Sequence, residues 1–216
     1  MRGMERGMPP EGVEARLEAE LLWDPAGRGC AALAVPGDLG AAARALLAAR
    51  RVAIVTGLYV PAAGAPETDG PPGSLALARA LGRLGKSVVL VTDRLCAGLL
   101  QAAAKAGWGA WPVLFRGDGA DGGAADGDGR PEGLLEEVLD GFEPDHLVAV
   151  ERLGRAADGR YYNARGEDVT AWTPALDGLF LEAAERSVAT TGIGDGGNEV
   201  GMGKVRDRVE SHLPHG

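Results

Sequence analysis

The sequence has little of what several large classes of protein require. Only two of its 216 residues are cysteine, Cys30 and Cys96, and they form neither a disulfide framework nor a zinc-ligand pattern. Lysine and arginine number 22 against 31 aspartates and glutamates, which gives a net charge of −9, and the longest basic run is Arg50-Arg51. Because nucleic acids and anionic membranes need a clustered basic face, we expect neither as a partner.

Long apolar runs are also missing. The most apolar stretch, residues 41–60, is interrupted by Arg44, Arg50 and Arg51, so no segment is expected to span a membrane. The first residues include charged ones, but no apolar run follows them, so we expect no secretory signal. Together with the low cysteine content, these features predict a cytoplasmic protein.

Glycine, by contrast, is abundant. The chain has 35 glycines, about 16% of its residues against about 7% in an average protein, and they follow no collagen-like period. Hydrophobic residues make up 45% of the chain, which is enough to bury a core. The length predicts one α/β domain over residues 35–216, preceded by an N-terminal helical segment over residues 1–34.

Five short apolar runs predict buried strands. They cover residues 51–56, 87–92, 111–115, 146–150 and 187–191. Segments with helical spacing separate them, and strands of this kind that alternate with helices are typical of a doubly wound, mainly parallel sheet with helices on both faces. The predicted core includes Val52, Ile54, Val89, Val91, Leu114, Val148, Val150 and Val188.

The helices have predicted boundaries of their own. Asp38 is predicted to cap a helix over residues 39–49, and Thr173 to cap a helix that starts at Pro174. A further helix is expected after the last strand, as far as about His212. Residues 117–130 are rich in glycine and aspartate, which predicts a mobile surface loop.

Acidic residues gather where the predicted strands end. Glu67 and Asp69 follow the first strand, Glu151 follows the fourth, and Asp195 and Glu199 follow the fifth. Because the carboxyl ends of parallel strands meet at one edge, where open α/β sheets bind ligands, we expect acids from these loops to line one crevice. Taken singly, each acid is as readily a helix cap or a solvated side chain.

The loop after the fifth strand has two interpretations. Its glycines have the G-x-G-x-x-G spacing of dinucleotide-binding proteins, but Asp195 would repel a pyrophosphate, so NAD and FAD are not expected. The side-chain oxygens of Asp195, Asn198 and Glu199 suit a hard cation or a substrate ammonium instead. A tight turn whose acids face a helix N-terminus is the alternative.

A long connection follows the fourth strand. It runs over about 20 residues, a length that is often functional in compact domains. Arg152, Tyr162, Asn163 and Arg165 lie in it and can bind a carboxylate. The alternative is a surface excursion whose tyrosines pack on the domain.

Three sequence blocks resemble the C-terminal domain of the D-glutamate cyclase family. They are VAIVTG with ETDGPPGSLALARAL in residues 52–81, DHLVAVERLGRAADGRYYNARGEDVT in residues 145–170, and TGIGDGGNEVGMGKV in residues 191–205. The resemblance implies a hydro-lyase that converts D-glutamate to 5-oxo-D-proline and water. Because family members continue past the position of Gly216 with a glycine-rich strand and helix, it also implies a domain that is incomplete at its C-terminus.

The reaction that the resemblance implies needs groups that deprotonate the substrate ammonium and polarise its γ-carboxylate. The catalytic candidates are Asp195, Glu199 and Asp69. The expected substrate-binding residues are Gly57, Glu67, Gly70, Glu151, Arg152, Tyr162, Asn163, Arg165, Gly194, Gly196, Gly197 and Asn198. No metal ligands are assigned, and a divalent cation is a candidate cofactor.

Two other functions stay open. One is a truncated, inactive small-molecule-binding domain of the same family, and the other is a metal-dependent enzyme that acts on another acidic metabolite. A domain that lacks its last strand would also expose an apolar sheet edge, which predicts self-association.

Overall fold

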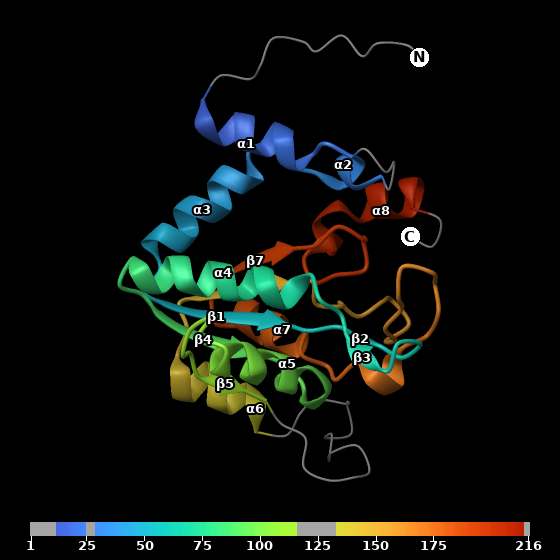
Figure 1. Ribbon diagram of the computed structural model, residues 1–216. Helices are drawn as coiled ribbons and strands as arrows, with labels where there is room; N and C mark the ends of the chain where they lie inside the picture. The colour runs from blue at the N-terminus through green and yellow to red at the C-terminus, as the bar shows by residue number, and fades with distance from the viewer. Residues whose placement is uncertain (1–11, 25–28, 116–132, 214–216) are drawn as a thin grey trace.

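The computed structural model describes residues 12–24, 29–115 and 133–213 (Figure 1). The predicted loop over residues 117–130 lies outside the described residues. At the centre is a sheet of five parallel strands in the order β5-β4-β1-β6-β7. The strands are β1 (Arg51–Thr56), β4 (Ser87–Val91), β5 (Val113–Leu114), β6 (His146–Val150) and β7 (Ala189–Ile193).

The order of the strands creates a topological switch point. From β1 the chain moves to β4 and β5 on one side, and then returns to β6 on the other side of β1. Ile54 in β1 is therefore in register with both Leu90 in β4 and Val148 in β6. Ligands of such sheets bind beyond the carboxyl ends of the strands where the order reverses, which are β1 and β6 here.

The two faces of the sheet have separate cores. Successive strand residues face opposite sides, so Val52 and Ile54 pack in one core and Ala53 and Val55 in the other. Helices that contribute to the first core are α3 (Asp38–Ala48), α4 (Gly70–Arg83) and α5 (Arg94–Lys105). Those that contribute to the second are α6 (Leu134–Glu136), the π-helix η1 (Glu137–Phe142) and α7 (Gly178–Glu185). Figure 1 shows α4 and α6 on opposite sides of the sheet, and the predicted doubly wound α/β fold is confirmed.

Most of the predicted core is buried. Two of its members, Leu114 and Val188, are only partly buried. Leu114 lies in the edge strand β5, and Val188 directly precedes the edge strand β7, so each has sheet on one side alone. Both nevertheless pack against the second core.

Both predicted helix caps are wrong. Asp38 is the first residue of α3, and the carboxylate that accepts the N–H groups of Gly37 and Leu39 belongs to Glu18 instead. The α7 helix starts at Gly178 rather than at Pro174, and the Thr173 hydroxyl donates to a backbone carbonyl. A distant carboxylate therefore takes the place of the predicted cap at α3, whereas the N-cap residue of α7, Asp177, makes no side-chain cap hydrogen bond.

Several short elements were not predicted. The helix expected after the last strand is also shorter than predicted, because a loop and a turn of 3-10 helix come before it. The elements that were not predicted are β2 (Tyr59–Val60), β3 (Ala65–Pro66), η2 (Thr170–Trp172) and η3 (Met202–Val205). The helices α1 (Val13–Leu21) and α2 (Cys30–Leu33) lie in the predicted N-terminal helical segment, and α8 (Arg206–His212) lies in the helix predicted after the last strand. In the part of the chain that the structure describes, no helix has the length and apolar character to cross a membrane.

A buried ion pair ties together the carboxyl ends of three strands. Arg152 follows β6, Asp93 follows β4, and both side chains are 1% exposed. The Arg152 Nη1 donates to Asp93 and, at 2.6 Å, to the carbonyl of Gly57 after β1, while its Nη2 donates to the carbonyl of Pro174. Asp93 also caps α5, because its carboxylate accepts the N–H of Cys96 at 3.1 Å. Because both side chains are shielded from solvent, water cannot solvate either charge if the other is removed.

Replacing Arg152 by methionine should lower the free energy of unfolding by about 3–5 kcal/mol, because Asp93 would stay buried without an opposite charge. Arg160→Met is the matched control, since its ion pair with Asp168 joins side chains that are 61% and 43% exposed. That variant should lose about 1 kcal/mol or less. Urea unfolding followed by circular dichroism measures both, and equal losses would contradict a special role for the buried pair.

Candidate functional site

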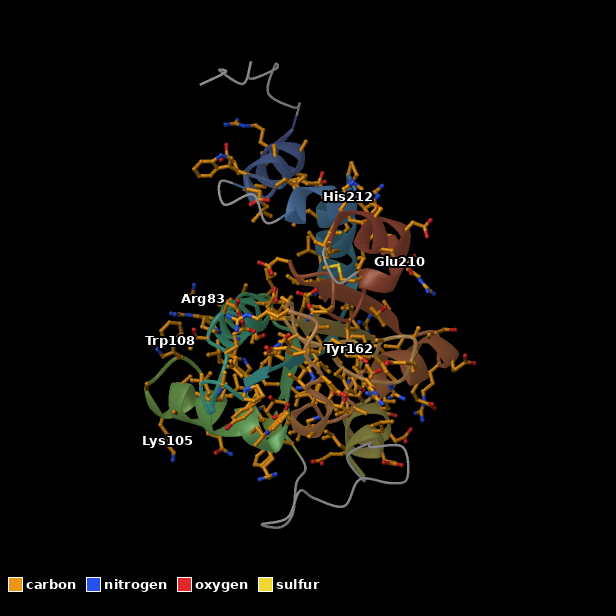
Figure 2. All side chains as sticks on the ribbon, turned by 90° about the vertical axis from the view of Figure 1, so that its right-hand side faces the viewer. Arg83, Lys105, Trp108, Tyr162, Glu210 and His212 are labelled. Carbon is orange, nitrogen blue, oxygen red and sulfur yellow. The ribbon has the colours of Figure 1, made fainter. Side chains whose placement is uncertain are left out.

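Three carboxylates meet at the switch point. Glu151 directly follows β6, and Asp195 and Glu199 lie in the loop after β7. Each contributes one carboxylate oxygen to a group whose members all lie within 4.8 Å of one another. Figure 2 looks onto the side of the molecule toward which β1 points in Figure 1, and Tyr162 is labelled on this side.

Glu151 has an unusual backbone conformation. Its φ is +48°, in the left-handed region that residues other than glycine seldom adopt. Its N–H donates to the carbonyl of Ile193 in β7 at 2.9 Å, so the sheet holds this conformation in place. Backbone strain of this kind concentrates at functional sites, because the surrounding structure must maintain it.

The surroundings of Glu151 also change its acidity. Burial, and after it the negative charges of Glu199, Asp195, Asp69 and Glu67, raise the pKa of Glu151 from 4.5 to about 8. Its carboxyl group is therefore mostly protonated at neutral pH. We refer to these five residues as the acidic cluster.

Glu199 organises the loop in which it lies. Its side chain is buried, and its carboxylate accepts the N–H groups of Asp195 at 3.1 Å, Gly196 at 2.6 Å and Gly197 at 2.8 Å. A Cβ atom on Gly194 would lie 2.6 Å from the Glu199 carboxyl carbon, so only glycine lets the loop close around this group. The three donors use both carboxylate oxygens, which makes Glu199 a residue that positions the loop.

The start of α4 brings two more acids close to Glu151. Asp69 is the N-cap residue of α4, and its carboxylate accepts the N–H of Gly70 at 2.7 Å. A Cβ atom on Gly70 would lie 2.8 Å from the Cβ of Glu151 and 3.2 Å from the carbonyl of Val150. Gly70 therefore allows the helix to approach the end of β6, and Glu67 precedes it on the same connection.

The loops after β6 and β7 are joined to each other. The amide of Asn198 donates to the carbonyl of Tyr162 at 2.8 Å. The N–H of Gly154 donates to the carbonyl of Asn198, and the N–H of Val200 to that of Arg152. Asn198 and Tyr162, both expected as substrate contacts, thus hold the two loops in a fixed relation.

Asn163 and Arg165 lie at a turn of the first of these loops. The Asn163 side-chain oxygen accepts the N–H groups of Arg165 at 2.9 Å and Glu167 at 3.0 Å, and its amide donates to the Glu167 carboxylate at 2.6 Å. The Asn163 side chain is therefore used to build the turn, and Arg165 is exposed at its tip. The structure does not bring these two predicted residues into the acidic cluster.

Two other predicted substrate contacts lie beneath the cluster. The guanidinium of Arg152 is enclosed by Asp93 and two carbonyl groups, so a substrate carboxylate has no access to it. Gly57 is buried with a φ of +115°, and a Cβ atom there would lie 2.7 Å from the Thr92 hydroxyl. Both residues position the strand ends, and their prediction as ligand contacts is corrected accordingly.

Thr56 is a polar residue of this region that the sequence reasoning missed. It ends β1, is fully buried, and its hydroxyl has no hydrogen-bond partner among the described residues. The hydroxyl lies 3.0 Å from the point that a Cβ on Gly70 would occupy, and the Cβ of Glu151 lies 2.8 Å from the same point. The only signal in the sequence is a threonine at the end of an apolar strand.

The cluster can do two kinds of chemistry. Crowded carboxylates repel one another unless a proton, a cation or hydrogen-bond donors compensate their charge. Backbone donors compensate Glu199 and a proton compensates Glu151, so Glu151 and Asp195 form a pair that can exchange a proton. Three carboxylate oxygens at this spacing also suit a divalent cation, which stays a prediction.

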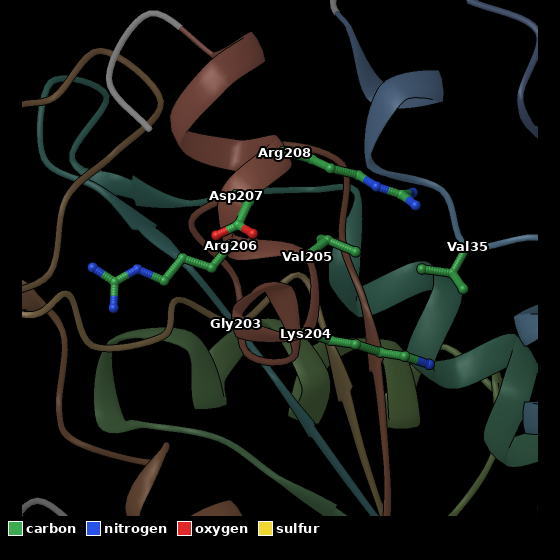
Figure 3. Close-up of a pocket in the computed structure, with 7 residues that line it drawn as sticks. All are labelled: Val35, Gly203, Lys204, Val205, Arg206, Asp207 and Arg208. Carbon is green, nitrogen blue, oxygen red and sulfur yellow. The ribbon is translucent and has the colours of Figure 1, made fainter.

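A pocket of about 440 Å³ lies elsewhere, at the start of α8 (Figure 3). Its basic side chains do not converge on a ligand, because Lys204 pairs with Asp38, Arg206 pairs with Glu210, and Arg206 and Arg208 point to opposite sides. We assign no function to it. The lining residues are Val35, Gly203, Lys204, Val205, Arg206, Asp207 and Arg208.

Comparison with known proteins gives two matches. The family model of the D-glutamate cyclase-like C-terminal domain matches residues 17–216. The mitochondrial D-glutamate cyclase of Homo sapiens is 38% identical over 211 residues, which cover 93% of this chain and 33% of the human protein. The chain therefore spans about a third of the length of this curated relative.

The mitochondrial relative contradicts the cytoplasmic location predicted from the sequence. That prediction depended on a low cysteine content and on the lack of an apolar N-terminal run. Neither feature distinguishes the cytoplasm from other reducing compartments, so the inference was too narrow.

The close approach of α4 to the acidic cluster predicts opposite effects of two substitutions in one helix. Gly70→Ala should lower the free energy of unfolding by about 1–3 kcal/mol, because the new methyl group overpacks against Glu151 and Thr56. Gly73→Ala should be neutral or stabilise by up to about 1 kcal/mol, since its methyl group would lie 3.8 Å from Val150. Thermal and urea unfolding measure both changes, and a harmless Gly70→Ala would show that the approach is looser than described.

Proposed function

The chain belongs to the D-glutamate cyclase-like family, as its sequence blocks indicate, and from this premise we propose that it converts D-glutamate to 5-oxo-D-proline and water. The observation that carries the proposal is the meeting of Glu151 and Asp195 oxygens within 4.8 Å of each other, where burial and negative charge raise the pKa of Glu151 to about 8. This pair supplies the acid and the base that the reaction needs.

The reaction is an internal condensation with no redox change. The substrate nitrogen forms a bond to the γ-carbon, and one of the two carbon–oxygen bonds of the γ-carboxylate breaks. Two protons leave the ammonium nitrogen, and the departing oxygen takes up two protons and leaves as water. A catalyst therefore has to move protons from nitrogen to oxygen within one small molecule.

In the proposed mechanism Asp195 accepts the first proton from the substrate ammonium, and Glu151 donates its own proton to the departing oxygen. Because oxygens of the two side chains lie within 4.8 Å of each other, Asp195 can pass this proton to Glu151, which donates it to the same departing oxygen. Asp195 then accepts the second proton of the substrate nitrogen and passes it to Glu151, which restores the starting state of both residues. Asp69, Glu67 and Glu199 contribute negative charge that attracts the ammonium group. The protonated state of Glu151 reduces the repulsion that the γ-carboxylate meets.

The purified chain should convert D-glutamate to 5-oxo-D-proline, and should act poorly on L-glutamate. The wrong enantiomer cannot place its ammonium and two carboxylates together, and so leaves a charge unpaired in the site. Chiral chromatography of each reaction measures the product. The proposal is wrong if D-glutamate is not converted or if both enantiomers react equally.

A chelator identifies the source of the catalysis. Turnover that survives EDTA supports proton transfer by the carboxyl pair alone. Loss of turnover that a divalent cation restores would instead support the predicted cofactor.

Glu151→Gln should lower kcat by about 10²- to 10⁴-fold, the usual contribution of an acid–base residue. In the unmodified chain turnover should fall as the pH rises through about 8, since the carboxyl group of Glu151 then loses its proton. Glu185→Gln is the control, because Glu185 is exposed at the end of α7. A loss of activity that is equal in both variants would contradict the role of Glu151.

The same variant tests the pKa of Glu151 through stability. Between pH 4.5 and about 8 the carboxyl group is ionised in the unfolded chain but protonated in the folded one, so the stability of the unmodified chain decreases with rising pH over this range. Glutamine does not titrate. The melting temperature of Glu151→Gln should therefore exceed that of the unmodified chain by a difference that grows from pH 4.5 and is constant above about 8.

A further inference from the structure

Helix α1 turns its apolar side chains away from the protein. Val13, Leu17 and Leu21 follow one another at four-residue spacing and are 74%, 54% and 71% exposed. None of the residues of α1 is buried. We call these three side chains the α1 stripe. Figure 1 shows α1 above α3, on the far side of that helix from the sheet.

Two of the three acids of the same helix face α3. The Glu14 carboxylate accepts a hydrogen bond from Arg44 of α3 at 2.8 Å, and Glu18 accepts the N–H groups of Gly37 at 3.0 Å and Leu39 at 3.3 Å at the start of α3. These polar contacts fix how α1 is rotated on α3. The orientation is the reverse of the usual one for a helix on a protein surface, whose apolar side faces the core.

We propose that the α1 stripe is the contact surface of a homodimer, in which the α1 helices of two copies pack antiparallel across a two-fold axis at Leu17. In that arrangement Leu17 meets Leu17 of the second copy, and Val13 meets Leu21 of the second copy. The stripe is therefore complementary to itself, as an isologous interface requires.

Charges beside the stripe match the same arrangement. Arg16 and Glu20 are exposed, lie one turn apart on the same side of the stripe, and make no ion pair within the described residues. In the antiparallel pair Arg16 lies beside Glu20 of the second copy, and the symmetry repeats this contact. The two contacts favour a second copy of this chain over an unrelated apolar partner.

The interface is small, since each copy contributes a helix of 9 residues. Stable interfaces usually bury at least about 1,200 Å², so the dimer should be weak and reversible. Sedimentation from about 5 to 500 µM, a range chosen for such weak association, should show a mass that rises from monomer toward dimer. A chain that stays monomeric over the whole range overturns the proposal, and the α1 stripe would then have to contact something other than a second copy.

Matched substitutions locate the interface. Leu17→Glu places like charges on the axis and should weaken association by more than about tenfold, while Ala19→Glu adds the same charge to the opposite side of α1 and should leave association unchanged. Ile193→Lys, on the exposed edge strand β7, tests the other surface from which self-association was predicted. Equal effects of Leu17→Glu and Ala19→Glu, or an effect of Ile193→Lys alone, would exclude the α1 stripe.

Charge exchange tests the antiparallel orientation. Arg16→Glu and Glu20→Arg should each weaken association by about 2- to 5-fold, because each brings like charges together. The double variant should restore it, since the pair is only reversed. Both residues are exposed in the monomer, so unchanged melting temperatures confirm folding. Failure of the double variant to recover overturns the antiparallel arrangement.

Discussion

The buried ion pair between Arg152 and Asp93 holds together the strand ends next to the acidic cluster. It reaches the carbonyl of Gly57 after β1, the cap of α5 after β4, and the backbone of the segment that precedes α7. Two charges without water are costly to separate, so the ends of three strands keep a fixed distance from one another. Glu151 is the residue next to Arg152, and its left-handed backbone is held by the hydrogen bond from its N–H to the carbonyl of Ile193 in β7.

Close backbone approach is the second condition for the cluster. Gly70 lets α4 touch the end of β6, and Gly194 and Gly196 let the loop after β7 close on the carboxylate of Glu199. Side chains at these positions would push the acids apart and admit water between them. The crowding that raises the pKa of Glu151 is thus a consequence of glycine placement as much as of the acids themselves.

Sequence patterns predicted the parallel sheet and the meeting of Glu151, Asp195 and Glu199, because both follow from local features: apolar strands alternate with helices, and acids follow the strands. The function of that site stays a prediction. The patterns did not predict which side chains are buried at the strand ends. Arg152 resembles a carboxylate-binding residue in the sequence, but its partner Asp93 is 59 positions away and only the fold brings them together. The cap assigned to Asp38 was wrong for the same reason, since the distant Glu18 takes its place, whereas the cap assigned to Thr173 was wrong because α7 begins later, at Gly178.

Glu151 and Glu199 show why residue type alone does not assign a role at such a site. Their carboxylates are neighbours, but three backbone N–H groups surround that of Glu199, whereas burial and negative charge surround that of Glu151. The first environment stabilises an anion and uses it to shape a loop, and the second favours a protonated acid that can give its proton to a reacting group. The different roles of these two glutamates therefore follow from where the backbone places its N–H donors. The N–H of Asp195 is one of the three that donate to Glu199, so the same loop holds Asp195 close to Glu151.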